Sequence, residues 1–255
     1  MKSAFLFFTG IIFILFLLLT AGCQTSQMQQ PENPAAPGFN LAASDSAAIA
    51  IADSVMKHLG GRQNWDNTRY LQWRFFGRRF HLWDKWTGKY RLENKNTTVL
   101  MNLNSKSGRA WKDGREITQP DSLEIVMDNA YRIWINDSYW VFMPYKLKDS
   151  GVTLKYAGLD TTSYGAEAHK LSLTFQAVGV TPQNKYDVFV DPGSYLVIEW
   201  AYFADAGDEK PKMANPWSNW KKYGNIMLSD NRGHSRIHTD IAVYDSLDAS
   251  VFTNP

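Results

Sequence analysis

The side chains that could act as nucleophiles, general acids or metal ligands are few and scattered. The sequence contains no Gly-x-Ser-x-Gly, His-Glu-x-x-His or Walker motif. One metal-like grouping exists, in which His234, His238 and Asp240 would share a face of a predicted strand, with Arg236 between the histidines. Residues four apart on a strand are roughly 13 Å apart, too far to share one ion. The grouping therefore favours a solvated strand face, and we assign no metal ligand and no cofactor.

Acidic pairs offer a second possible chemistry. Asp187 with Asp191, or Glu199 with Asp205, could supply the two carboxyl groups of a glycoside hydrolase. The many aromatic residues would suit stacking against sugars. A chain with 25 acidic residues contains such pairs by chance. We therefore expect no catalytic residue and no enzyme activity, and a carbohydrate-active enzyme is the weakest alternative.

Composition excludes further classes of protein. The chain has 255 residues, enough for one large domain or two small ones. Its 27 basic residues against 25 acidic ones leave a net charge of +2, which excludes nucleic-acid binding through bulk basicity. A run of basic and aromatic residues over residues 70–83 resembles a nucleic-acid surface. It is better explained by two adjacent strands with arginine on their solvent-exposed face. The single cysteine, Cys23, excludes an internal disulfide framework and a cysteine-clustered zinc site.

The surroundings of Cys23 predict a lipid anchor. Nineteen residues from Ala4 to Gly22 carry no charge, which is also long enough for an uncleaved anchor helix. The run Leu19-Thr20-Ala21-Gly22-Cys23, with small residues directly before the cysteine, resembles the signal of bacterial lipoproteins. This resemblance implies that residues 1–22 are a cleaved signal peptide. It also implies that Cys23 is the lipid attachment site, carrying acyl chains such as palmitate.

The residues after Cys23 predict the location and a tether. Gln24 stands where Asp would retain an enterobacterial lipoprotein at the inner membrane, so the resemblance implies the outer membrane. No acidic residue follows before Pro31, whereas surface-exported lipoproteins of Bacteroidota usually carry an acidic cluster there. The periplasmic face is therefore favoured, with the cell surface as the alternative. Residues 23–43 are rich in Gln and Pro and predict a disordered tether, which leaves residues 44–255 as one domain.

Apolar periodicity predicts two helices. The first begins near Ser44 or Asp45 and ends at Gly60-Gly61, with its apolar stripe at Ala48, Ile51, Ala52, Val55, Met56 and Leu59. The second is signalled by Pro120-Asp121-Ser122, with its stripe at Leu123, Val126, Met127, Ala130, Tyr131 and Trp134. We expect both stripes to face the core.

Most other segments alternate between polar and apolar residues. The clearest are residues 70–75, 80–83, 99–103, 170–175, 186–190 and 236–243. About ten or eleven short strands without strand–helix alternation predict a mainly β (α+β) fold. The expected architecture is one strongly curved antiparallel sheet or half-barrel with two main helices.

Two segments, residues 196–203 and 139–143, read as strands that are apolar on both faces. A helix can cover one such face, and the other needs a second cover. Large rigid side chains on a curved sheet can frame an apolar cavity. We expect the wall of a hydrophobic ligand site to be formed by Trp73, Phe75, Trp83, Trp140, Phe142, Trp200 and Tyr202. A dry, packed core is the alternative.

Several runs resemble uncharacterised Bacteroidota outer-membrane lipoproteins that contain a domain of unknown function. These runs are residues 134–149, 171–175, 178–182 and 186–191, in the same order. The layout is more distantly similar to the LolA/LolB-like superfamily of lipoprotein carriers, where a helix ending in Gly-Gly precedes a curved sheet whose concave side is plugged by helices. The resemblance implies a concave apolar face that holds acyl chains, lipids or lipoproteins, and it carries over no catalytic residue.

We therefore expect a lipid-anchored periplasmic protein that binds an acyl chain, a lipid or a lipoprotein. Its partners would be the membrane, through the N-terminal acyl chains, and that ligand, with no nucleic acid. The alternative is an envelope scaffold that binds other proteins and holds no small ligand.

Overall fold

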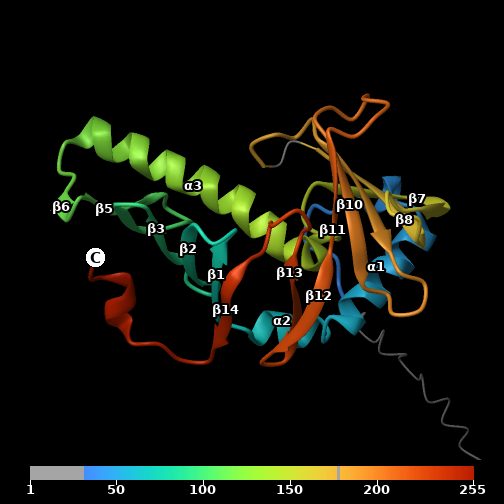
Figure 1. Cartoon of the computed structure of the whole chain (residues 1–255), viewed down its shortest axis with the longest axis horizontal. Helices are drawn as coiled ribbons and strands as arrows, with labels where there is room; N and C mark the ends of the chain where they lie inside the picture. Colours follow the sequence, from blue (N-terminus) through green and yellow to red (C-terminus); the bar gives the residue numbers. More distant parts are fainter. Residues whose placement is uncertain (1–31, 177–178) are drawn as a thin grey trace, which may run out of the picture. The chain divides into compact units, whose positions relative to one another are not determined.

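Antiparallel strands make up most of the regular secondary structure in the described residues. The computed structural model describes residues 32–176 and 179–255. In these ranges, fourteen strands form three antiparallel sheets, accompanied by three α-helices (Figure 1). The predicted mainly β fold is therefore confirmed. The predicted signal peptide and the lipid attachment site Cys23 lie outside the described residues.

The larger sheet, sheet A, is a series of hairpins, and the last strand of the chain is added at one of its edges. Its order is β14-β1-β2-β3-β4-β5-β6. The last strand pairs with the first, with Tyr70 opposite Tyr244. The strands are β1 (Tyr70–Phe75), β2 (Arg79–Asp84), β3 (Lys89–Asn94), β4 (Thr97–Asn102), β5 (Ser107–Lys112), β6 (Arg115–Glu116) and β14 (Thr239–Tyr244).

Sheet B is a second run of neighbouring strands, in the order β11-β10-β9-β8-β7. A separate hairpin, β12–β13, contacts β10 on one side and β14 on the other, so it links the two sheets. The predicted single sheet of ten or eleven strands therefore had too few strands and missed this division. The strands are β7 (Val152–Thr161), β8 (Glu167–Phe175), β9 (Lys185–Val190), β10 (Val197–Phe203), β11 (Met213–Pro216), β12 (Ser218–Tyr223) and β13 (Ile226–Asn231).

Helix α1 (Ser46–His58) forms where apolar periodicity predicts it. Its predicted stripe is buried, from Ala48 to Met56. Gly60 and Gly61 then leave the helix with φ of 111° and 89°, a region that L side chains rarely adopt. A Cβ atom at Gly60 would lie 2.4 Å from the carbonyl oxygen of Asn225, so glycine also permits close packing against the β12–β13 turn. A short helix, α2 (Arg62–Asn67), follows.

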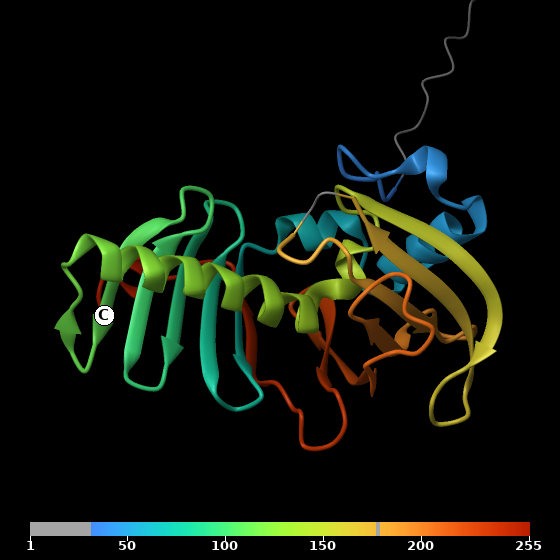
Figure 2. The ribbon, with the colours of Figure 1, turned by 90° about the horizontal axis from the view of Figure 1, so that it is seen from above.

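Helix α3 (Pro120–Phe142) connects the two sheets. It begins as predicted, with Pro120 in its first turn. Its 23 residues span about 35 Å. Figures 1 and 2 show the helix lying lengthwise over sheet A and reaching sheet B with its C-terminal end. No helix among the described residues combines the length and the apolar character needed to cross a bilayer.

The prediction of a strand over residues 139–143 is wrong. Residues 139–142 form the last turn of α3, and the 3₁₀ helix η2 (Met143–Lys146) continues from it. Tyr, Trp, Val and Phe are common in strands, but burial decides here: Val141 and Phe142 are each 1% exposed. The segment is apolar all round because the end of the helix lies inside the protein.

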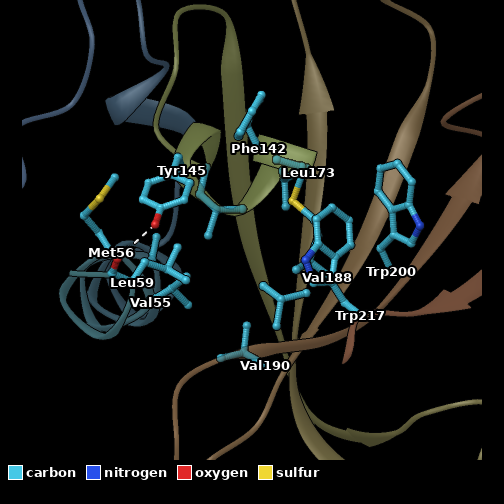
Figure 3. Packing of buried hydrophobic residues seen from close by; sticks show 14 of the residues in the cluster. Val55, Met56, Leu59, Phe142, Tyr145, Leu173, Val188, Val190, Trp200 and Trp217 are labelled. Atoms are coloured by element: carbon cyan, nitrogen blue, oxygen red, sulfur yellow. Dashed lines mark hydrogen bonds between the residues drawn. The ribbon is translucent and has the colours of Figure 1, made fainter. Parts of the chain in front are cut away.

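Two hydrophobic clusters lie beneath α3. The smaller one packs the first half of α3, at Met127 and Ala130, against β3, β4 and β5 of sheet A. The larger one joins α1, the end of α3, η2, strand β1 of sheet A and sheet B. Figure 3 shows part of it, with Val55, Met56 and Leu59 beside Tyr145, and Leu173 and Val188 nearby. The C-terminal half of α3 is therefore fixed by both sheets.

Residues 33–43, which were predicted to belong to a disordered tether, pack on the domain instead. Phe39 joins the larger cluster. Backbone N–H groups of Ala36 and Asn40 donate to carbonyls of Lys148 and Val152, and Asn33 Nδ2 donates to Asp53 Oδ1 at 2.8 Å. The segment also contains a 3₁₀ helix, η1 (Leu41–Ala43). Two buried side chains, Asn33 and Phe39, hold the segment against the domain.

A buried arginine caps the C-terminal end of α3. The carbonyls in the last turn of a helix have no partner within the helix. Arg232, 0% exposed, donates from Nε and Nη2 to the carbonyl oxygen of Trp140 at 3.1 and 2.7 Å. Its guanidinium also lies 3.5 Å above the centre of the Trp217 ring. A cation at this position is stabilised by the negative end of the helix dipole.

His238 lies beside this cap, and the predicted strand face of His234, His238 and Asp240 is wrong. Residues 233–235 form a turn with positive φ, and β14 begins only at Thr239. His238 is 2% exposed and stacks on Phe76 at 4.8 Å, while the Asp240 carboxylate pairs with Arg74 at 2.7 Å. Burial, followed by the charges of Arg232 and His81, lowers the pKa of His238 well below its ordinary value.

Replacing Arg232 with alanine is expected to lower the free energy of unfolding by about 3 kcal/mol. The change leaves the Trp140 carbonyl buried without its donor and opens a cavity under Trp217. Urea unfolding measures the loss. Arg132→Ala is the control, because Arg132 lies on the exposed side of α3 in a surface pair with Asp128, and its loss is expected to stay below about 0.5 kcal/mol. Equal losses would contradict the capping role.

The unfolding free energy is expected to fall as the pH drops below 6.5. The unfolded chain then binds a proton at residue 238 that the folded protein does not, since the folded pKa is lowered. One such histidine contributes up to about 1.4 kcal/mol per pH unit. Urea titrations between pH 5 and 8 of the parent and of His238→Phe compare the two slopes. The variant is expected to show the smaller slope, and parallel curves would contradict the assignment.

Candidate ligand-binding cavity

A cavity of about 430 Å³, which we call the first cavity, lies between the end of α3 and the inner face of sheet B. This is within the range of small-molecule sites. Its lining comes from α3, the end of β1, four strands of sheet B and the segment between β8 and β9. The lining residues are Phe75, Ile135, Asn136, Tyr139, Trp140, Phe175, Gly179, Val180, Thr181, Asn184, Tyr186, Trp200, Tyr202 and Met213.

Helical and strand periodicity together place this wall. Ile135 and Tyr139 are four residues apart on α3 and therefore share one face of the helix. Tyr186 on β9 lies directly opposite Tyr202 on β10. Trp200 is two residues before Tyr202, so it projects from the same face of the sheet. Its ring stacks on Tyr186 at 5.0 Å and meets Trp140 edge-on at 4.8 Å.

A second cavity of about 290 Å³ adjoins the first. Ile135, Tyr139, Phe175 and Gly179 line both, so they form the boundary between the two. Trp65, Trp83, Trp134 and Phe142 line only the second. The Tyr139 ring packs against Phe175 at 6.4 Å and Tyr186 at 5.2 Å. Tyr139 therefore forms part of the boundary that separates the two spaces.

The structure brings six of the seven predicted wall residues to these cavities. Phe75, Trp140, Trp200 and Tyr202 line the first, while Trp83 and Phe142 line the second. Trp140 and Phe142 reach them from a helix and not from a strand. Trp73 lines neither cavity, because it is 0% exposed and stacks on His81 at 4.5 Å within the core.

Sequence reasoning missed Tyr139, Tyr186 and Ile135 as cavity residues. Tyr186 carried a usable signal, since it alternates with Val188 on a strand that leads into the apolar segment at residue 197. Ile135 and Tyr139 also share a helical spacing. The helical spacing of Ile135 and Tyr139 could not be used, because residues 139–143 were predicted to form a strand.

A buried cluster of charged side chains joins α3 to strand β2 of sheet A. Asp137, 0% exposed, accepts from Arg79 Nε and Nη2 at 2.6 and 2.8 Å, and His81 Nε2 lies 3.0 Å from its Oδ2. His81 Nδ1 lies 2.7 Å from the Tyr90 hydroxyl. Burial acts to raise the pKa of the Asp137 carboxyl, but the hydrogen bonds from His81 and Arg79 outweigh it and hold the pKa below its ordinary value. This ionised carboxylate ties the cavity-lining part of α3 to β2.

The carboxylates considered for glycoside hydrolysis have structural partners. Glu199, 1% exposed, accepts from the backbone N–H and the hydroxyl of Ser163. Asp191 accepts from the Ser194 N–H at 2.6 Å, and such bonds lower the pKa of its carboxyl. Asp205 accepts from the Gly207 N–H at 2.9 Å. Across residues 32–176 and 179–255, no three or more His, Cys, Asp or Glu side chains gather as a metal site would require.

Comparison with known proteins finds only distant similarity. No protein-family profile and no curated protein matches the sequence. A DUF1329 family protein from Desulfovibrio piger is 12% identical, with 80% of this chain and 96% of that chain covered and a TM-score of 0.41. A proposed outer membrane lipoprotein-sorting protein domain from Vibrio parahaemolyticus is 11% identical, with coverage of 81% and 96% and a TM-score of 0.38. The resemblances stated from the sequence therefore stay predictions.

Proposed function

We propose that this protein is a lipid-anchored envelope protein that binds an apolar ligand in the two adjoining cavities. The observation that carries the proposal is the pair of aromatic-lined cavities between α3 and sheet B. Protein interiors are close-packed, with few voids larger than a water molecule. Spaces of about 430 and 290 Å³ are far larger than such voids, and together they have the size of a small-molecule site.

The chemistry of the lining favours a hydrocarbon occupant. Phe75, Phe175, Trp140, Trp200 and Met213 present rings, and one thioether, to the first cavity. Burying an apolar ligand there gains about 25 cal/mol for each Å² removed from water, with no change in covalent bonding. An acyl chain, either of a free lipid or of a lipoprotein, provides such a surface.

Exposed lining residues, Asn136 on α3 and Gly179, Val180 and Thr181 before β9, mark the mouth of the first cavity. Val180 is 43% exposed, and Asn136 is also exposed, although both line the cavity. The opening therefore lies between α3 and the segment that follows β8. A ligand that enters here passes an apolar side chain and an amide before it reaches Tyr139 and Trp200.

The proposed anchor rests on the sequence around Cys23. Acyl chains on this residue would keep the domain at a membrane, since each buried CH₂ contributes about 0.8 kcal/mol. We assign the periplasmic face of the outer membrane, from Gln24 and the absence of acidic residues up to Pro31.

Ile135→Trp is expected to reduce ligand uptake at least tenfold, because the larger ring fills the boundary between the cavities. The full chain in phospholipid vesicles is irradiated with a diazirine-labelled fatty alcohol, and labelled peptides are quantified by mass spectrometry. Ile125→Trp is the matched control, on the same helix but 69% exposed. Equal labelling of the two variants, or no labelling of cavity peptides in the parent, would refute the ligand-binding function.

Cys23→Ser is expected to abolish incorporation of a clickable palmitate analogue in growing cells and to release the protein from the membrane fraction. Ser26→Ala is the control and should label as the parent does. Membrane retention of the serine variant with no label would instead identify an uncleaved anchor helix.

A further inference from the structure

The first cavity has aromatic and amide groups but no charge of its own. None of its described lining residues is Lys, Arg, His, Asp or Glu. Burial raises the pKa of the Tyr139 hydroxyl well above its ordinary value, and the same cause raises that of Tyr186, so both phenols stay neutral. A carboxylate or phosphate drawn into this space would lose its hydration without gaining a counter-charge.

Strand alternation explains why the nearby charges do not reach the cavity. On β9, Lys185 and Asp187 flank Tyr186 in sequence and therefore point to the opposite face. Lys185 Nζ lies 3.9 Å above the Phe203 ring, and Asp187 lies 3.6 Å from Lys170. On β10, the Glu199 carboxylate likewise points away from the cavity and accepts a hydrogen bond from the Ser163 N–H. The fold thus separates an outer charged face from an inner uncharged one.

Two hydrogen-bond donors in the lining lack acceptors. Among the described residues, no partner contacts the indole Nε1 of Trp200, whose side chain is 1% exposed, or the hydroxyl of Tyr139. Figure 3 shows the indole nitrogen on the side of Trp200 turned away from Val188 and Trp217. Buried donors normally have a partner, because an unsatisfied one is costly. Both atoms are covered in this structure, so a ligand's neutral oxygen would supply the partner once the Tyr139 and Trp200 rings shift to admit it.

We propose that the first cavity selects an uncharged lipid, a hydrocarbon chain that carries an ester or amide carbonyl, over the same chain ending in a carboxylate or phosphate. The carbonyl oxygen accepts from Tyr139 and Trp200, and the chain fills the aromatic space. This selection rests on the ligand-binding function proposed above and adds the chemical class of the ligand.

Competition in the photolabelling assay tests the selection. The full chain in vesicles is labelled with a diazirine monoacylglycerol while unlabelled monopalmitoylglycerol or palmitate is added at pH 8. Monopalmitoylglycerol is expected to compete at least tenfold more effectively. Equal competition, or stronger competition by palmitate, would overturn the selection and leave ligand binding intact. Absence of cavity labelling by any probe would instead refute ligand binding itself.

A pair of tyrosine variants separates hydrogen bonding from the shape of the cavity. Tyr139→Phe removes an unpartnered hydroxyl and keeps the ring, so the preference for monopalmitoylglycerol is expected to fall at least threefold. Tyr164→Phe is the control, because Tyr164 lines neither cavity and its hydroxyl donates to the carbonyl oxygen of Ile198 at 3.0 Å, and its preference should match the parent. An unchanged preference in Tyr139→Phe would overturn the role of this donor.

Discussion

The structure depends on a helix that ends inside the protein. Helix α3 passes from one sheet to the other, so the carbonyls of its last turn are buried where water cannot satisfy them. Arg232 supplies the donors for Trp140, and the Tyr145 hydroxyl lies within hydrogen-bond distance of the carbonyls of Leu59 and Met227 and accepts from the Met227 N–H. These bonds fix η2 to α1 and to the β12–β13 hairpin. Without them, the face of α3 that lines the cavities would have no defined position.

Charge and apolar surface occupy different faces of the same elements. On α3, Asp137 turns to Arg79 and His81, while Ile135 and Tyr139 line the cavities. On β9 and β10, period-two alternation directs Lys185, Asp187 and Glu199 outward, whereas Tyr186, Trp200 and Tyr202 point inward. The charged faces anchor the elements to their neighbours, which leaves the inner faces free of ion pairs. An uncharged cavity is therefore a product of the packing that holds its walls.

Local patterns in the sequence predicted the parts of the fold that have one buried face. Helix α1, the start of α3 and strands β8 and β9 show clear periodicity, since one side of each meets the core. The polar strand β12 carries no such pattern, and the β-favouring residues 139–142 are helical because long-range burial overrides local preference. Most of the aromatic wall could be named from residue type, but the roles of Tyr139 and Arg232 depend on contacts between distant segments.

The pairing of the last strand with the first makes the site a late product of folding. The Tyr244 hydroxyl bonds Gln72 across 172 residues, and Arg232 lies on the same closing segment. Synthesis delivers α3 long before it delivers the arginine that caps it. The loop closures required are long, and such topologies fold slowly. The cavity wall is therefore assembled only once nearly the whole chain is present, and a chain cut short before β13 would lack a defined cavity.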